Sequence, residues 1–233
     1  QGSVLGPVIF NLYANDLQDC LKDGSTCFQY ADDTTVLLHA PPKDLKDCVN
    51  RMNNILQSIA DCNLLLNATK TRQMLITTRQ MSRVHDIGDY TPPLSLKNKI
   101  VDRVDRFRLL GTLLSEELKW TEHVNNVTSS CFGVLAVLRK IKNMTPQETK
   151  KSLVPSLVLS KLNFNDTITY PLPMFLQKRM QRVQNAAAGF ALNRYCSEED
   201  VLQLGWLPTL ENTKLNILKL DTMLFTTTTG LNI

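Results

Sequence analysis

Two adjacent carboxylates, Asp32 and Asp33, are the side chains in this sequence that most clearly suggest chemistry. Strand-forming residues stand on both sides of them, in the run Phe-Gln-Tyr-Ala-Asp-Asp-Thr-Thr-Val at 28–36. This pattern predicts a β-hairpin over 27–39 with the acidic pair at or beside its turn. Side chains alternate faces along a strand, so the two carboxylates lie together only where a turn rotates one of them. Such a turn can offer oxygen ligands to a hard divalent cation such as Mg²⁺.

The sequence before the acidic pair helps to distinguish a functional pair of carboxylates from an ordinary turn. Aspartate is a common turn residue for local reasons, so two aspartates alone point first to an ordinary turn. Upstream, however, the chain reads Gln-Gly-Ser-Val-Leu-Gly-Pro at 1–7, and apolar residues then recur at helical spacing. We predict an amphipathic helix over 7–22 that ends near Gly24. Gly2 and Gly6 would let the backbone approach a substrate closely; alternatively, Ser3 only caps the helix.

Gln-Gly-Ser-x-Leu-Gly-Pro, followed after one helix by Tyr-Ala-Asp-Asp-Thr, resembles the reverse transcriptase (RNA-directed DNA polymerase) of non-LTR, LINE- or jockey-like retrotransposons. The order and spacing match the template-side loop and helix of that family, and then its catalytic hairpin. The resemblance implies that Asp32 and Asp33 are catalytic metal ligands, Asp33 being the weaker one. It also implies that Gln1, Gly2 and Ser3 lie on the template and nucleotide side.

Further downstream, the resemblance assigns two more groups of residues, and clusters of basic residues suggest a third. Asn67–Thr71 matches an Asn-x-x-Lys-Thr segment and implies that Lys70 gives a proton to the departing pyrophosphate; alternatively, Lys70 is a solvated turn residue. Leu110 and Gly111 stand where the family has Tyr-Leu-Gly beside the primer end, with Leu109 in place of the aromatic residue. Contacts to phosphates are expected from four basic residues, although such charges commonly only face water: Arg106, Arg108, Arg139 and Lys140.

The predicted fold class is α+β. The resemblance implies that 1–115 is the C-terminal part of an incomplete polymerase palm, an antiparallel sheet with packed helices, and that 116–233 is an all-helical, thumb-like region with the part that follows the thumb. Apolar periodicity predicts a helix at 43–61 and strands near 64–66 and 74–78. Turn residues then indicate a surface loop at 79–93, a hairpin at 94–104 and a strand pair at 107–114 that bends at Gly111. Predicted helices then begin at Thr121, at a capping box Thr145–Glu148, at 173, at Ser197 and at 210.

Composition sets broad limits on the protein class. The 233 residues are 43% hydrophobic and 21% charged, which is ordinary globular composition, and a net charge of +4 permits nucleic-acid binding without arguing for it. The six cysteines form no Cys-x-x-Cys pair, so we expect free thiols in a reducing compartment, either nuclear or cytoplasmic. No apolar run is long enough to predict a membrane span, and no signal segment opens the chain.

The chain begins with Gln inside a motif, so we expect either an interior piece of a longer polyprotein or the conceptual translation of a truncated element. The resemblance implies a second catalytic Asp on a strand upstream of Gln1, and therefore no polymerisation by this piece alone. The implied cofactors are two Mg²⁺ (or Mn²⁺) ions. The implied partners are an RNA template, a DNA primer, deoxynucleotide triphosphates and the missing N-terminal part of the polyprotein, with no membrane.

Two alternatives stay open. The chain could be a decayed or domesticated fragment that acts only as a nucleic-acid-binding or interaction module. It could also be a different palm-type enzyme, such as a nucleotide cyclase. The segment Gln1–Pro7 and the helical second half disfavour that last alternative.

Overall fold

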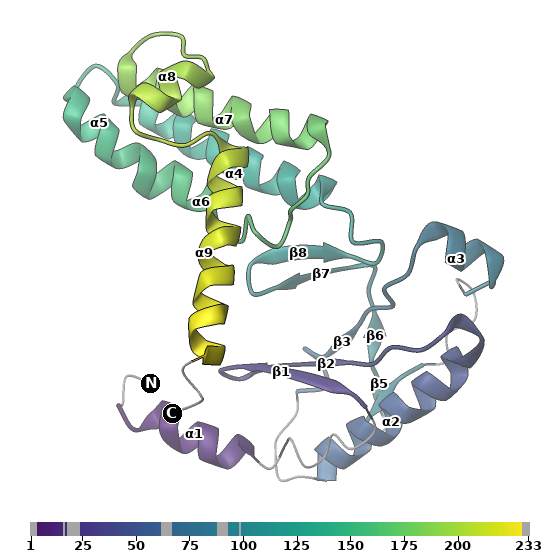
Figure 1. Ribbon diagram of the computed structural model, residues 1–233. Helices are drawn as coiled ribbons and strands as arrows, with labels where there is room; N and C mark the ends of the chain where they lie inside the picture. The colour runs from purple at the N-terminus through teal and green to yellow at the C-terminus, as the bar shows by residue number, and fades with distance from the viewer. Residues whose placement is uncertain are drawn as a thin grey trace. The chain divides into compact units, whose positions relative to one another are not determined.

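The computed structural model describes residues 4–15, 17, 24–61, 67–87, 93–97 and 99–229. The chain divides into two compact units (Figure 1). One comprises Gln1–Phe107 and Ser115–Leu118, and the other comprises Arg108–Leu114 and Lys119–Ile233. Helices and small sheets are both present, so the fold is of the α+β class.

The first unit begins with one helix and the hairpin that holds the acidic pair. Its further elements are short strands, helical segments and the two ends of a last hairpin, whose residues Arg108–Leu114 belong to the second unit. In chain order they are α1 (Gly6–Ala14), β1 (Thr26–Tyr30), β2 (Asp33–Leu37), η2 (Pro42–Asp44), α2 (Leu45–Asp61), β3 (Arg72–Gln73), α3 (Arg79–Val84), β4 (Ser95–Leu96), β5 (Lys99–Ile100), β6 (Asp102–Arg103), β7 (Arg106–Leu109) and β8 (Thr112–Ser115).

The predicted antiparallel sheet is not formed among the described residues. Their strands make four separate two-stranded sheets, β1–β2, β3–β6, β4–β5 and β7–β8, and the β3–β6 pair is parallel. The acidic hairpin and the strand pair at 107–114 were predicted correctly. The predicted hairpin at 94–104 is confirmed only for β4 and β5, because β6 pairs with β3 instead. The predicted strand at 74–78 was wrong, because the strand there is confined to Arg72–Gln73, which pairs with β6.

Helix α2 packs on the inner face of the β1–β2 hairpin. Ile55 and Ile59 are buried with Leu17, and Cys27 and Val36 of the hairpin pack against them. Cys27 and Val36 are cross-strand partners, so they lie on one face of the sheet. The predicted helix at 43–61 is therefore confirmed, together with its apolar stripe.

Two other predictions for the first unit were wrong or partly outside the described residues. The predicted loop at 79–93 contains helix α3, whose first turn is capped by Thr78: its hydroxyl accepts a hydrogen bond from the N–H of Met81 over 3.2 Å. Helix α1 ends at Ala14, earlier than the predicted 7–22, and residues 16 and 18–23 lie outside the described residues.

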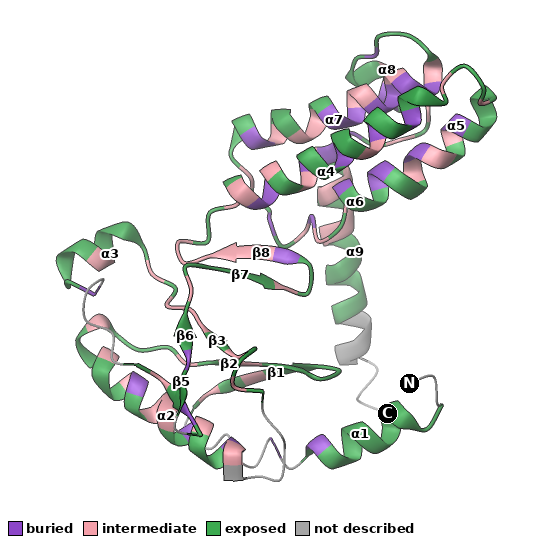
Figure 2. Ribbon diagram, turned by 180° about the vertical axis from the view of Figure 1, so that it is seen from behind, coloured by how far each residue is buried: buried purple, intermediate pink, exposed green. Residues whose placement is uncertain are grey.

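The second unit is a helical bundle. Helices α4 and α7 pack side by side, and α5 packs on α7. Buried residues line the faces where α4, α5 and α7 meet (Figure 2). The elements are α4 (Thr121–Lys140), α5 (Gln147–Val154), η3 (Pro155–Leu159), α6 (Ser160–Leu162), α7 (Met174–Leu192), α8 (Glu198–Gln203) and α9 (Thr209–Thr229).

The helix ends of this unit test the predicted caps. The cap of α8 is confirmed, because Ser197 and Asp200 form a reciprocal capping box. Thr121 is the first helical residue rather than the cap of α4, and Thr145 donates its hydroxyl to the carbonyl of Ile141 instead of capping α5. Pro155 has no N–H to continue α5, and the chain passes there into one π-helical segment, η3.

No helix within the described ranges is both long enough and apolar enough to cross a membrane. The cysteines of these ranges are free thiols: Cys131 and Cys196 are buried, and Cys27 and Cys48 are half-buried. Burial raises the pKa of Cys131 to about 11, so this thiol packs as a small apolar side chain.

Candidate functional site

The acidic pair lies at the tip of the β1–β2 hairpin (Figure 1). Tyr30 pairs with Asp33 at the end of the ladder, which leaves Ala31 and Asp32 as a two-residue turn. Ala31 has φ +51° and Asp32 has a negative φ, which is the φ pattern of a type II′ turn. Asp33 is thus the first ladder residue and Asp32 belongs to the turn, so strand alternation does not force the two carboxylates onto opposite faces.

Ala31 is a backbone outlier. Left-handed φ values suit glycine, and a residue with a Cβ adopts them at a cost of about 1–2 kcal/mol. A cost of this kind at a turn that presents two carboxylates is typical of functional sites, where the surrounding structure holds a strained backbone. The residue that precedes Asp32 therefore fixes the turn geometry at the expense of local stability.

The two faces of the hairpin have different roles. Cys27 and Val36 face α2, as described above. Phe28 and Tyr30 point to the opposite face and are 58% and 66% exposed. Asp33 shares that exposed face with Tyr30, because directly paired residues project to the same side of a sheet. The acidic pair therefore opens toward solvent beside two exposed aromatic rings.

The donor chemistry of the turn fits a hard divalent cation. Both carboxylates are exposed, and neither side chain forms a hydrogen bond or an ion pair with another described residue. Their oxygen atoms are thus available as ligands of the type that Mg²⁺ and Mn²⁺ prefer. Over the described ranges, no group of three or more His, Cys, Asp or Glu side chains gathers closely enough to hold a metal ion.

Lys70 lies on a separate tight turn of the same unit. The side-chain oxygen of Asn67 accepts hydrogen bonds from the backbone N–H groups of Thr69 and Lys70 over 3.1 and 3.3 Å. This arrangement satisfies the backbone within the turn and leaves the Lys70 side chain exposed. Among the described residues, no ion pair joins Lys70 to Asp32 or Asp33. The role of Lys70 in proton transfer stays a prediction.

The other predicted positions divide between the two units. Leu110 and Gly111 form the turn of the β7–β8 hairpin, with φ +45° and +89°, and this turn belongs to the second unit. Positive φ at both central residues is the pattern of a type I′ turn. Gln1, Gly2 and Ser3 lie outside the described residues.

Four basic residues were predicted to contact phosphates, and all of them are exposed. Arg106 lies 3.5 Å from the carboxylate of Asp105, while Arg139 and Lys140 occupy the last turn of α4, where positive charge also complements the helix dipole. Arg108 acts on a buried neighbour: burial, and secondarily the Arg108 guanidinium, lower the pKa of His123.

The sequence analysis missed His123, Thr112 and Asn165, which surround the Leu110–Gly111 turn. Nδ1 of His123 accepts the N–H of Leu113 over 3.2 Å, and the Asn165 side chain donates to the hydroxyl of Thr112 over 2.7 Å. His123 continues the apolar stripe of α4 four residues before Val127, and that position was the available signal for a buried role. Nothing local in the sequence marks Thr112 or Asn165.

Comparison with known proteins gives a consistent picture. Residues 1–114 match the family model described as reverse transcriptase (RNA-dependent DNA polymerase). A probable RNA-directed DNA polymerase from transposon BS of Drosophila melanogaster is 28% identical over 156 residues, which are 61% of this chain and 16% of that protein. The RNA-directed DNA polymerase from mobile element jockey of Drosophila melanogaster is 24% identical over 137 residues, or 54% of this chain and 14% of that protein. The chain thus matches about a sixth of the length of these relatives.

Proposed function

Residues 1–114 belong to the reverse transcriptase family, and from this premise we propose that the chain is the part of an RNA-directed DNA polymerase that carries its acidic catalytic hairpin and its primer-side hairpin. In this proposal the first unit is part of the polymerase palm, and the helical unit is the thumb with the region that follows it. The reaction joins the 3′-oxygen of a DNA primer to the α-phosphorus of a deoxynucleotide triphosphate and releases pyrophosphate. RNA serves as the template.

The turn at Ala31–Asp32 is the observation that carries the proposal. It presents two consecutive, exposed carboxylates on a strained backbone, within the segment that matches the family. Nucleotidyl transfer needs oxygen ligands for divalent cations at the point where the primer end meets the triphosphate. A turn that served only to connect two strands would gain stability from glycine at position 31.

Asp32 and Asp33 are the residues that would hold divalent cations, two Mg²⁺ or Mn²⁺ ions in the complete enzyme. Such ions, when bound, make the primer 3′-hydroxyl a stronger nucleophile and neutralise charge on the triphosphate. In the proposal, Asp32, which belongs to the turn, contributes most of the cation binding. Asp33 is the weaker ligand, at the first position of β2. Lys70 gives a proton to the leaving pyrophosphate.

The remaining proposed contacts surround this reaction centre. Gln1, Gly2 and Ser3 would lie beside the template and the incoming nucleotide, and Leu110 and Gly111 beside the primer end. The exposed guanidinium and ammonium groups of four residues would contact the phosphate backbone: Arg106, Arg108, Arg139 and Lys140.

A second function is favoured by the exposed basic residues of α7. Lys178, Arg179 and Arg182 lie within five positions on the solvent side of the helix, where they could follow a nucleic-acid backbone without catalysis. Under this alternative, the chain binds RNA or DNA in a salt-dependent manner, and Asp32 has no influence on any reaction.

Primer extension on a poly(rA) template with an oligo(dT) primer separates the two functions. The assay uses this chain and a longer protein that contains it, each with Mg²⁺ or Mn²⁺. We expect extension by the longer protein only. In that protein Asp32→Asn should reduce extension by about 100-fold or more, and Asp44→Asn, a carboxylate in η2 beyond the hairpin, should leave it unchanged. Equal extension by the wild type and Asp32→Asn would contradict the proposed role of the turn. Salt-dependent binding by both proteins with no extension in either would favour the second function.

A further inference from the structure

Three consecutive residues of the β7–β8 hairpin are each held by a different side chain of the helical unit. A Cβ atom added to Gly111 would lie 2.8 Å from Cε1 of Phe164, so the ring packs directly against this glycine. Asn165 donates its side-chain N–H to the hydroxyl of Thr112 over 2.7 Å. The N–H of Leu113 donates to Nδ1 of His123 over 3.2 Å. We refer to Phe164, Asn165 and His123 as the brace.

The brace comes from two elements that are themselves fixed. His123 lies in the first turn of α4 and its ring contacts Trp120 edge-on, at 6.2 Å between centroids. Phe164 and Asn165 belong to the loop that joins α6 to α7. Asn165 adopts φ +56°, a left-handed conformation that asparagine tolerates better than most residues.

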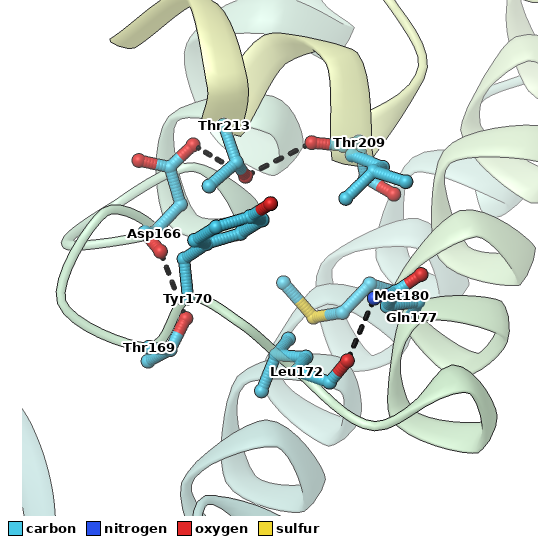
Figure 3. Close-up of a pocket in the computed structure, with 9 residues that line it drawn as sticks. Asp166, Thr169, Tyr170, Leu172, Gln177, Met180, Thr209 and Thr213 are labelled. Carbon is cyan, nitrogen blue, oxygen red and sulfur yellow. Dashed lines mark hydrogen bonds between the residues drawn. The ribbon is translucent and has the colours of Figure 1, made fainter. Parts of the chain in front are cut away.

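The loop is anchored on its other side by α9. Figure 3 shows the Asp166 carboxylate directed toward Thr213 of α9. That carboxylate accepts hydrogen bonds from Thr213 over 3.0 Å and from the side chain of Asn216 over 3.1 Å. The Thr169 hydroxyl donates to the carbonyl oxygen of Asp166 over 2.9 Å, which closes the loop on itself. Residues 164 and 165 therefore sit in a loop that is held at α9 as well as at the hairpin.

The held turn points outward, which argues against simple core packing. Thr112 is 3% exposed, whereas Leu110 is 45% exposed and Phe164 is 54% exposed. Leu110 also carries a left-handed φ of +45°, which is unfavourable for a side chain of its size. A solvent-facing turn gains little from burial, so three independent contacts at its base serve mainly to fix its position. Residues that must meet a substrate end need such support from neighbours whose own side chains are locked.

We propose that the brace holds the Leu110–Gly111 turn in the position where it meets the 3′ end of the primer, with Asn165 as the principal positioning residue. This inference rests on the proposed function, because only a polymerase requires the primer end to be held at one point. Phe164 and His123 act through the turn and touch no substrate. The brace therefore affects the recognition of a primer terminus rather than the overall attraction to nucleic acid.

The test compares two RNA–DNA hybrids of equal length, one with a recessed DNA 3′ end and one blunt. Fluorescence anisotropy gives the Kd of the full 233-residue chain for each. The variants are Asn165→Ala and Thr112→Val, which each remove one partner of the 2.7 Å contact. Thr112→Ser keeps the hydroxyl and serves as the conservative rescue. Asn163→Ala changes an asparagine in the same loop whose side chain has no hydrogen bond to another described residue.

We expect the wild type to prefer the recessed end, and Asn165→Ala and Thr112→Val to weaken binding to the recessed hybrid by about fivefold while leaving the blunt hybrid unchanged. Thr112→Ser and Asn163→Ala should behave like the wild type. The double variant should be no worse than either single one, since both remove the same contact. Equal weakening of both hybrids, or an unchanged preference, would overturn the positioning role and leave the proposed function standing. Absence of binding to both hybrids by the wild type would overturn the proposed function, and this inference with it.

Discussion

The N–H of Leu113 and Nδ1 of His123 lie 3.2 Å apart in a hydrogen bond that requires an unprotonated Nδ1. His123 is buried, and burial is the main reason that its pKa lies below 6.5, with the Arg108 guanidinium as the second cause. The imidazole is therefore neutral in the folded protein at a pH where it is already protonated in the unfolded chain.

This difference predicts that acidification destabilises the helical unit. Near and below pH 6.5 the imidazole of His123 binds protons more readily in the unfolded chain than in the folded protein, so the free energy of unfolding falls as the pH decreases. The loss ends below the folded-state pKa, where both states are protonated. Urea unfolding at several pH values measures this slope. His123→Asn keeps an acceptor without a titrating group and should show a smaller slope, whereas His85→Asn, at an exposed position, should follow the wild type. Identical slopes for all three proteins would contradict the assignment.

Replacement of Ala31 by glycine should stabilise the acidic hairpin. Glycine removes the cost of φ +51° at this position, about 1–2 kcal/mol, and restores about 0.5–1 kcal/mol of backbone entropy to the unfolded chain. The expected net gain in the free energy of unfolding is about 0.5–1 kcal/mol in urea. Ala60→Gly, within α2, should instead destabilise, since glycine in a helix costs up to about 1 kcal/mol. A loss of stability in Ala31→Gly would show that the turn is not strained.

Asp166→Asn should release α9 from the preceding loop. The aspartate oxygens accept hydrogen bonds from Asn212, Thr213 and Asn216, and an amide group turns one acceptor into a donor that faces other donors. We expect the free energy of unfolding to fall by about 1–3 kcal/mol and the backbone amides along α9 to exchange hydrogen faster. Asp221→Asn, on the exposed side of the same helix, is the matched control. Unchanged exchange in α9 would mean that its packing does not depend on Asp166.

Leu135→Ala should be among the most damaging substitutions in the helical bundle. The side chain is fully buried between α4 and its neighbours, and truncation leaves a cavity at a cost of about 2–5 kcal/mol. Val137, two positions away on the same helix, is 63% exposed, and Val137→Ala should change the free energy of unfolding by less than about 0.5 kcal/mol. Chemical denaturation compares the two. Similar losses would show that α4 packs with a different face.

The parts of the fold that could be predicted from sequence are those set by local periodicity. The stripe of α2 fixes both a helix and the face that it buries, and the residues around Asp32 specify a hairpin with its turn. Helix α3 was missed because it has few apolar residues and is fixed by a cap at Thr78 and an ion pair between Arg79 and Glu117, 38 positions away. Contacts of that kind leave no periodic signal.

The same distinction applies to the candidate site. The acidic pair and the Leu110–Gly111 turn are local motifs, and sequence analysis found both. The contact between Thr112 and Asn165 joins residues 53 positions apart, and neither residue type is unusual for its surroundings. Such a pair forms only when the loop between α6 and α7 meets the β7–β8 hairpin in the folded chain, so no local run of residues signals it.

The division of the chain has a practical consequence for its dissection. The chain enters the helical unit at Arg108, returns at Ser115 to the first unit, and leaves it again after Leu118, so both units are discontinuous in sequence. A truncated protein that ends near position 115 would keep both strands of the β7–β8 hairpin and lose every side chain that holds its turn. Conversely, a helical piece that begins at Lys119 would keep Phe164 but lack Gly111, the residue against which the Phe164 ring packs. An exchange of the helical unit between related proteins would therefore succeed only if residues Arg108–Leu114 were transferred together with the helices.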